Sequence, residues 1–199
     1  MLLKAIKKEN ILFFVLILLS ACHNNLIDKD YDDKITKDFI KQLIESQEKL
    51  YQERSFIHSN CILEQPEWTL IDNEFTSIIQ KELKIENKTF LEFQIDLLND
   101  FKIVKELTPN KKIITDLEYN KFNESFKENE FAYIDWLDEM SCKEGFSSIS
   151  KPIFNEKYNL AVIRYEKVCG PLCGGGVIAI YELIKGKWQQ KKIIDNWIY

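Results

Sequence analysis

The chain has 199 residues, a formal net charge of −5 at pH 7 and a 45% share of hydrophobic residues. This length and composition suit one globular domain with a substantial core. Because nucleic-acid binding needs a basic face, the acidic balance argues against a nucleic-acid partner. It also argues against general electrostatic adhesion to anionic lipid.

Residues 1–21 have the three-part organisation of a bacterial signal peptide. Three lysines lie within the first eight residues, residues 11–19 are continuously apolar, and two small residues precede Cys22. A membrane-spanning helix needs about 20 apolar residues, and this run has about half that number. We therefore expect a cleaved signal peptide rather than an uncleaved anchor.

The sequence Leu-Ser-Ala-Cys at residues 19–22 resembles the lipobox of bacterial lipoproteins. This resemblance implies that a diacylglyceryl group is added to the sulfur of Cys22 and that a lipoprotein signal peptidase cuts before it. The alternative is an ordinary secretory signal with a chance cysteine. Several acyl chains on one residue anchor a protein stably, whereas a single chain does not.

The expected location is therefore the periplasm or the cell surface, with the lipid most simply in the outer membrane of a Gram-negative bacterium. Cleavage removes three lysines and one glutamate, which leaves 24 basic and 31 acidic residues. Residues 22–33 are polar and acidic, so we expect a flexible tether. Its fully extended length is at most about 40 Å.

Four cysteines remain once Cys22 carries lipid, an even number in an oxidising compartment. Of the three possible pairings, the simplest is this one: Cys169 with Cys173, and Cys61 with Cys142. The first bridge would close a three-residue tip, and the second would join the helical part of the chain to its strands. A four-cysteine zinc site and a redox-active pair are the alternatives, although the spacing suits neither well.

Hydrophobic periodicity predicts the elements of residues 34–141. Apolar residues recur at helical spacing in residues 34–52, 74–83, Asn87 to about 100, and two stretches within 118–141. Asn87 is the expected N-cap of its helix. Residues 54–70 are expected to be irregular, and residues 111–115 to form a short strand.

The sequence changes character after residue 141, because all six glycines lie between residues 145 and 186. Strands are predicted over residues 146–150, 152–154, 160–168, 177–184 and 188–194. Short connections between the last three strands indicate an antiparallel meander. Helices followed by strands predict one α+β domain over 34–199, helical over 34–141 and β-rich over 145–199, with helices covering one face of the sheet.

Four segments of the β-rich part carry a resemblance: residues 146–155 (FSSISKPIFN), 169–176 (CGPLCGGG), 186–188 (GKW) and 196–198 (NWI). Together they resemble a family of uncharacterised lipoproteins from Bacteroidetes, over roughly residues 131–199. The resemblance implies a bacterial origin and a shared architecture. It brings no established activity with it.

The glycine-rich segment 169–176 is a candidate binding loop. Gly170, Gly174 and Gly175 have the freedom to let backbone N–H groups converge on an anion. A phosphate-binding loop, however, joins a strand to a helix, whereas this segment joins two predicted strands. The structural interpretation, a hairpin tip closed by a disulfide, is therefore favoured.

No arrangement of residues in the sequence points to a reaction, a cofactor or a metal. His58 lies three residues from Cys61, which is a weak signal for a nucleophile without a third, orienting group. Asp135, Asp138 and Glu139 suit either a hydrolase or a solvated acidic face. We therefore expect a non-enzymatic, lipid-anchored module whose partner is an envelope protein or a small ligand. The alternatives are a small periplasmic hydrolase and an immunity- or inhibitor-type lipoprotein.

Overall fold

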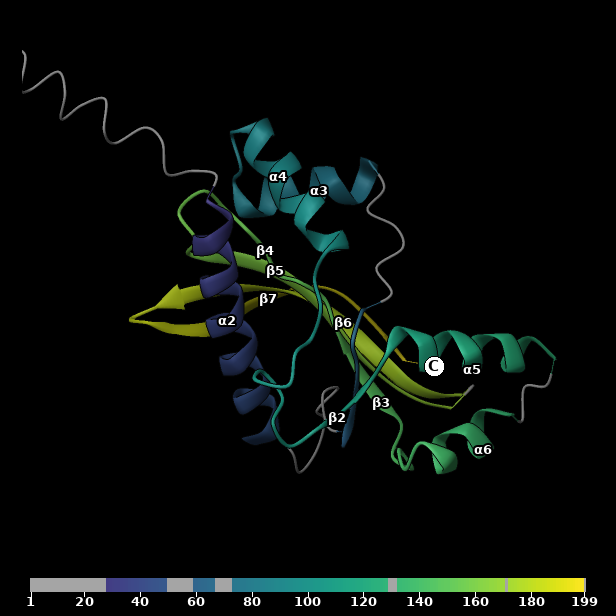
Figure 1. Cartoon of the computed structure of the whole chain (residues 1–199). Coiled ribbons are helices and arrows are strands. Elements are labelled where there is room, and N and C mark those ends of the chain that lie inside the picture. Colours follow the sequence, from purple (N-terminus) through teal and green to yellow (C-terminus); the bar gives the residue numbers. More distant parts are fainter. Residues whose placement is uncertain (1–27, 50–58, 67–72, 129–131, 171, 199) are drawn as a thin grey trace, which may run out of the picture.

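The computed structural model describes residues 28–49, 59–66, 73–128, 132–170 and 172–198. Within these residues the helices are α2 (Lys29–Lys49), α3 (Asn73–Leu83), α4 (Lys88–Asn99), α5 (Asp116–Glu128) and α6 (Ala132–Glu139). The strands are β1 (Cys61–Leu63), β2 (Lys112–Ile114), β3 (Phe146–Ile149), β4 (Ile153–Phe154), β5 (Leu160–Gly170), β6 (Cys173–Ile184) and β7 (Lys187–Ile198). The predicted α+β class is confirmed (Figure 1).

One mixed sheet joins all of these strands in the order β2-β1-β3-β5-β6-β7, with β4 paired to β5 beside that path. Strands β5, β6 and β7 form the predicted antiparallel meander. Strand β1 lies inside the stretch 54–70, which was predicted to be irregular. It pairs in parallel with both β2 and β3. All three residues of β1 are buried, so its short run lacks the alternation that identifies a half-exposed strand.

Two hydrophobic clusters fill the domain. The larger joins α2, α3 and α4 to strands β4 to β7, with Phe39 of α2 packed edge-on against Tyr181 and Trp188. The smaller lies where α5 and α6 run beside β1, β2 and β3, and there Phe122 stacks on Trp136. Figure 1 shows α2 crossing the sheet near one end and the α5–α6 pair at the other.

Helix α2 begins earlier than expected and shortens the predicted tether. Residues 29–33 were predicted to belong to that tether, but they form the first turn of α2. The carboxylate of Asp28 accepts hydrogen bonds from the backbone N–H groups of Asp30 and Tyr31, at 3.0 and 3.2 Å. This N-cap starts the helix before its apolar periodicity becomes visible in the sequence.

Helix α4 confirms the predicted N-cap, because the side chain of Asn87 accepts a hydrogen bond from the backbone N–H of Phe90. The β5–β6 hairpin differs from its prediction in length. Strand β6 begins at Cys173, so the glycines at 174–176 lie in a strand and not in a loop. Among the described residues, no helix has the length and apolar character needed to cross a membrane.

Candidate ligand-binding cavity

A cavity of about 290 Å³ lies between the first half of α2, the C-terminal end of α4 and the segment that follows α4. Its lining residues are Lys29, Asp33, Thr36, Lys37, Leu97, Asp100, Phe101, Lys102, Val104, Leu107 and Lys151. This volume is just below the usual range for small-molecule sites, about 300–1,000 Å³. The cavity therefore suits a small ligand or one part of a larger one.

The contribution of α2 follows from helical geometry. Its lining residues recur at spacings of three and four, so they share one face of the helix. The neighbouring positions Phe39, Ile40 and Leu43 pack into the larger core and fix the orientation of α2. The polar residues of the first two turns consequently face the end of α4 and the segment 101–107.

The lining is cationic although the whole chain is acidic. Four lysines against two aspartates give it a net charge of +2, whereas the chain carries −5. Lys29 lies 3.8 Å from Asp100, and both side chains are largely exposed. Lys37 is exposed and forms no ion pair within the described part of the chain, so it is available to solvent and ligand.

Lys151 forms the buried side of the cavity through an ion pair with Asp32. Its Nζ lies 2.7 Å from the carboxylate of Asp32, and the two side chains are 2% and 0% exposed. Gln94 of α4 donates to the same carboxylate at 2.5 Å, and its amide oxygen accepts from the backbone N–H of Phe154 at 2.9 Å. These contacts tie α2, α4 and β4 together behind the cavity.

The buried pair is stable because each charge has further partners. The ammonium of Lys151 also donates to the carbonyl of Pro152 at 3.2 Å and lies 5.5 Å from the ring centre of Phe154. Burial lowers the pKa of Lys151, and the facing carboxylate of Asp32 offsets part of that shift. An amine held on several sides and 2% exposed is suited to positioning the wall of the cavity rather than to attacking a ligand.

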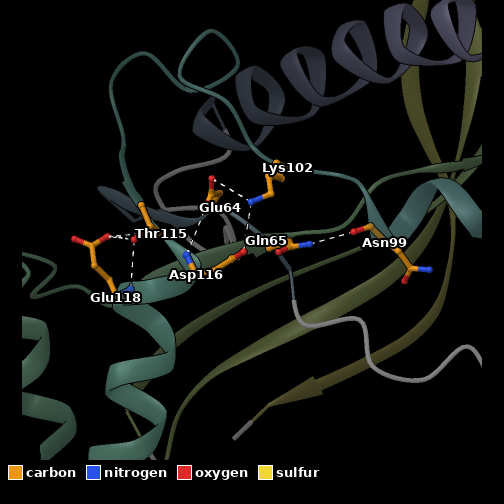
Figure 2. Close-up of polar contacts among 7 residues, drawn as sticks. All are labelled: Glu64, Gln65, Asn99, Lys102, Thr115, Asp116 and Glu118. Atoms are coloured by element: carbon orange, nitrogen blue, oxygen red, sulfur yellow. Dashed lines mark hydrogen bonds and ion pairs between the residues drawn. The ribbon is translucent and has the colours of Figure 1, made fainter.

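A second polar network fixes the other wall (Figure 2). The ammonium of Lys102 lies 3.5 Å from the carboxylates of both Glu64 and Asp116. Gln65 donates to the backbone carbonyl of Asn99 at 3.1 Å, which ties the segment after β1 to the end of α4. The charge of Lys102 is therefore already engaged by two carboxylates, and the segment after α4 is held in place.

Helix α5 begins beside this network with a capping box. The Thr115 hydroxyl accepts from the backbone N–H of Glu118, and the Glu118 carboxylate accepts from the backbone N–H of Thr115 at 2.8 Å. That second bond holds the pKa of Glu118 below its usual range. The residues drawn in Figure 2 thus form a structural junction between the segment after β1, the segment after α4 and the start of α5.

The three glycines of the candidate binding loop lie in strands, Gly170 at the end of β5 and Gly174 and Gly175 in β6. A binding role for this loop stays a prediction. Gly174 and Gly175 pair with Val168 and Lys167 of β5. A Cβ on the next glycine, Gly176, would collide with the ring of Trp197 and lie 2.7 Å from Cβ of Glu166. Glycine at 176 therefore allows a close approach between strands.

The side chain of Trp197 lies over Gly176 and supports a charged pair. The guanidinium of Arg164 lies 4.7 Å from the Trp197 ring centre, and it forms an ion pair with Glu166 at 2.9 Å. Each group is thus engaged by a neighbour on the sheet. The tryptophan near the end of β7 is therefore explained by its packing against Gly176 and Arg164.

The four cysteines form two disulfides, with the pairing that the sequence analysis took as simplest. The Cα–Cα distances are 5.8 Å for Cys61–Cys142 and 5.0 Å for Cys169–Cys173. A four-cysteine zinc site needs free thiolates, so it does not fit two disulfides. Across the described residues, no group of three or more His, Cys, Asp or Glu side chains is placed to hold a metal ion.

Other predicted residues are not brought into the cavity. Asp135, Asp138 and Glu139 are exposed on α6, where Asp138 lies 3.9 Å from Lys143. Cys22 and His58 lie outside the described residues. The acidic group on α6 therefore has the character of a solvated face.

Sequence reasoning missed the cavity because its walls come from distant segments. Lys37 and Lys151 are more than 100 positions apart, and no local motif joins them. The sequence shows the apolar face of α2, but it does not show which segments lie opposite the polar face of that helix. No family model, curated protein or solved structure matches this chain.

Proposed function

We propose that this chain is a lipid-anchored cell-envelope protein whose folded domain binds a small ligand without catalysing a reaction. The observation that carries the binding role is the cavity of about 290 Å³ between α2, the end of α4 and the following segment. Its walls are fixed by the Asp32–Lys151 pair and by the Glu64–Lys102 junction. A site with walls held in this way needs little reorganisation when a ligand enters.

The anchor is inferred from the signal peptide and from the lipobox that ends at Cys22. Since α2 starts at Lys29, residues 23–28 are the connection between the lipid and the domain. Six residues span at most about 20–22 Å, roughly half the reach expected from the sequence. Lys29 and Asp33 line the cavity, so the proposed anchor places the cavity at the membrane-proximal start of the domain.

Metabolic labelling with an alkyne-tagged fatty acid tests the anchor. We expect the wild-type protein to be labelled and to sediment with membranes, and Cys22→Ala to lose both properties. The Cys169→Ala/Cys173→Ala variant is the matched control, because it removes two other cysteines and should still be labelled. Equal labelling of wild type and Cys22→Ala would contradict the anchoring proposal.

A ligand screen tests the binding role independently of the anchor. The lipidated protein in phosphatidylcholine nanodiscs is titrated with small anionic, neutral and cationic compounds while the methyl NMR signals of Val104, Leu97 and Leu107 are followed. We expect at least one chemical class to shift these cavity signals saturably. If no class shifts them while the spectrum stays folded, the binding role is wrong.

A further inference from the structure

We infer that the cavity accepts a small amphiphilic anion, a phosphate or carboxylate attached to a short alkyl segment. Lys37 and Lys29 bind the charged group, and the apolar end of α4 with the segment after it receives the alkyl part. This inference rests on the proposed ligand-binding function and names the class of ligand. It is carried by the division of the lining into available cations and an apolar wall.

The cations of the lining are not equivalent. Lys151 is committed to Asp32, and Lys102 lies between the carboxylates of Glu64 and Asp116. Lys29 faces Asp100 at 3.8 Å across a largely exposed gap, and such a pair contributes little and exchanges easily. With Lys37 exposed on the same helix face, α2 thus offers two ammonium groups to an incoming anion.

The opposite wall carries apolar side chains beside the charged residues Asp100 and Lys102. Leu97, Phe101 and Leu107 line the cavity; Leu107 belongs to the larger core, Phe101 packs against that core, and Leu97 is buried. Val104 lines the same wall and is 38% exposed. Burying this surface against an alkyl segment stabilises a complex by about 25 cal/mol per Å² of apolar area, and a hydrated inorganic ion cannot provide that contribution.

Two sources could supply such a ligand. One is a soluble alkyl phosphate or carboxylate, and the other is the headgroup region of an anionic phospholipid, which the short connection to Cys22 brings within reach. The net charge of −5 argues against adhesion of the whole surface to anionic lipid. A lipid contact would therefore be local, with one headgroup at the cationic cavity.

The test uses the lipidated protein in phosphatidylcholine nanodiscs and three matched probes: hexyl phosphate, inorganic phosphate and hexyl glucoside. Binding is read from the Val104 methyl signals. Lys37→Glu removes the most available cation of the lining. Lys41→Glu is the matched control, since Lys41 is exposed one turn further along α2 and does not line the cavity.

We expect hexyl phosphate to bind more tightly than inorganic phosphate or hexyl glucoside. Lys37→Glu should weaken its binding about tenfold and Lys41→Glu less than about twofold, because screening limits charge effects from a distance. Added salt should weaken the wild-type complex as well. Equal affinity for hexyl phosphate and hexyl glucoside would leave the ligand-binding role standing and overturn the anionic class. Equal effects of the two charge reversals would overturn the assignment to Lys37.

A second arm distinguishes the sources. Phosphatidylglycerol replaces part of the phosphatidylcholine, and no soluble ligand is added. A shift of the Val104 signals that Lys37→Glu abolishes and Lys41→Glu retains supports the lipid source. Unchanged signals, with hexyl phosphate still binding, support the soluble source. In the first arm, binding of inorganic phosphate as tight as that of hexyl phosphate would overturn the amphiphilic class.

Discussion

The two hydrophobic clusters of this domain are held together by different means. Among the described residues the larger contains 26 buried side chains and the smaller nine. The larger lies beside a buried ion pair, Asp32–Lys151, whose lysine is 5.5 Å from the ring centre of Phe154 in that cluster, whereas the smaller contains the Cys61–Cys142 disulfide. Figure 1 shows the corresponding helices at opposite ends of the sheet.

This difference follows from how much burial each cluster provides. Fully burying a large apolar side chain contributes about 1.5–3 kcal/mol, so a large core can offset the desolvation of two paired charges. A core of nine residues has no such reserve. A cross-link that limits the unfolded ensemble is then a more effective source of stability. The comparison predicts that the two ends respond differently to substitution.

The largest effect is expected at the smaller cluster. Cys61→Ala/Cys142→Ala should lower the free energy of unfolding by about 4–5 kcal/mol, because the disulfide closes a loop between residues 81 positions apart. Removing the Cys169–Cys173 bridge, with a separation of four, should cost about 2 kcal/mol in the same chain-entropy account. Urea unfolding of the two double variants measures both losses of unfolding free energy. Equal losses would contradict the proposed dependence of the smaller cluster on its disulfide.

The next effect is expected at the buried pair of the larger cluster. Asp32→Ala leaves the ammonium of Lys151 buried without its carboxylate, which should cost about 3–5 kcal/mol. Asp32→Asn/Lys151→Met keeps an acceptor for Gln94 and removes both charges, so it should recover most of that loss. Urea unfolding of the three proteins measures the recovery. A double variant no more stable than Asp32→Ala would show that the pair is needed for more than charge balance.

The sequence predicted the parts of this fold that local patterns determine. The Asn87 cap and the strands β5 to β7 were visible because a cap residue and an apolar run between glycine-containing turns are local features of the sequence. Strand β1 was not, since three consecutive buried residues carry no periodicity. The cavity was not visible either, because the burial of Asp32 and Lys151 depends on segments more than 100 positions apart.

A moderate effect on the free energy of unfolding is expected from a substitution in the part of β5 and β6 that lies between the two clusters. Along β5, Val162 belongs to the larger core and Val168 packs on the smaller, while Arg164 and Glu166 lie between them on the same side of the strand. Gly176 pairs with Glu166 beneath Trp197.

Gly176→Ala should therefore destabilise the domain by about 1–3 kcal/mol, because its Cβ would force Trp197 away. Trp197→Ala in the same chain should reduce that penalty, and thermal unfolding of both single variants and the double variant gives the coupling. Additive losses would show that Trp197 does not limit the space at Gly176.

The smallest effect is expected at the start of α5, which packs on the smaller cluster. Glu118→Gln keeps a hydrogen-bond acceptor for the backbone N–H of Thr115 and removes the charge. Because the pKa of Glu118 is lowered in the folded protein, its charge stabilises the fold above the ordinary value of 4.5 and loses this contribution as the pH falls below it. Screening at this position limits the difference to less than about 1 kcal/mol.

Urea unfolding between about pH 3 and 7 measures the difference in the free energy of unfolding between wild type and Glu118→Gln. This range extends to either side of the ordinary pKa of a glutamate. The control is Glu124→Gln on the same helix. The difference should be present at neutral pH, where it should exceed that of the control, and it should disappear towards acid. In the Cys61→Ala/Cys142→Ala background the same charge should represent a larger share of the remaining stability, because the small core then depends on its helix caps. A pH-independent difference would mean that the amide introduced by Glu118→Gln disturbs the cap geometry itself.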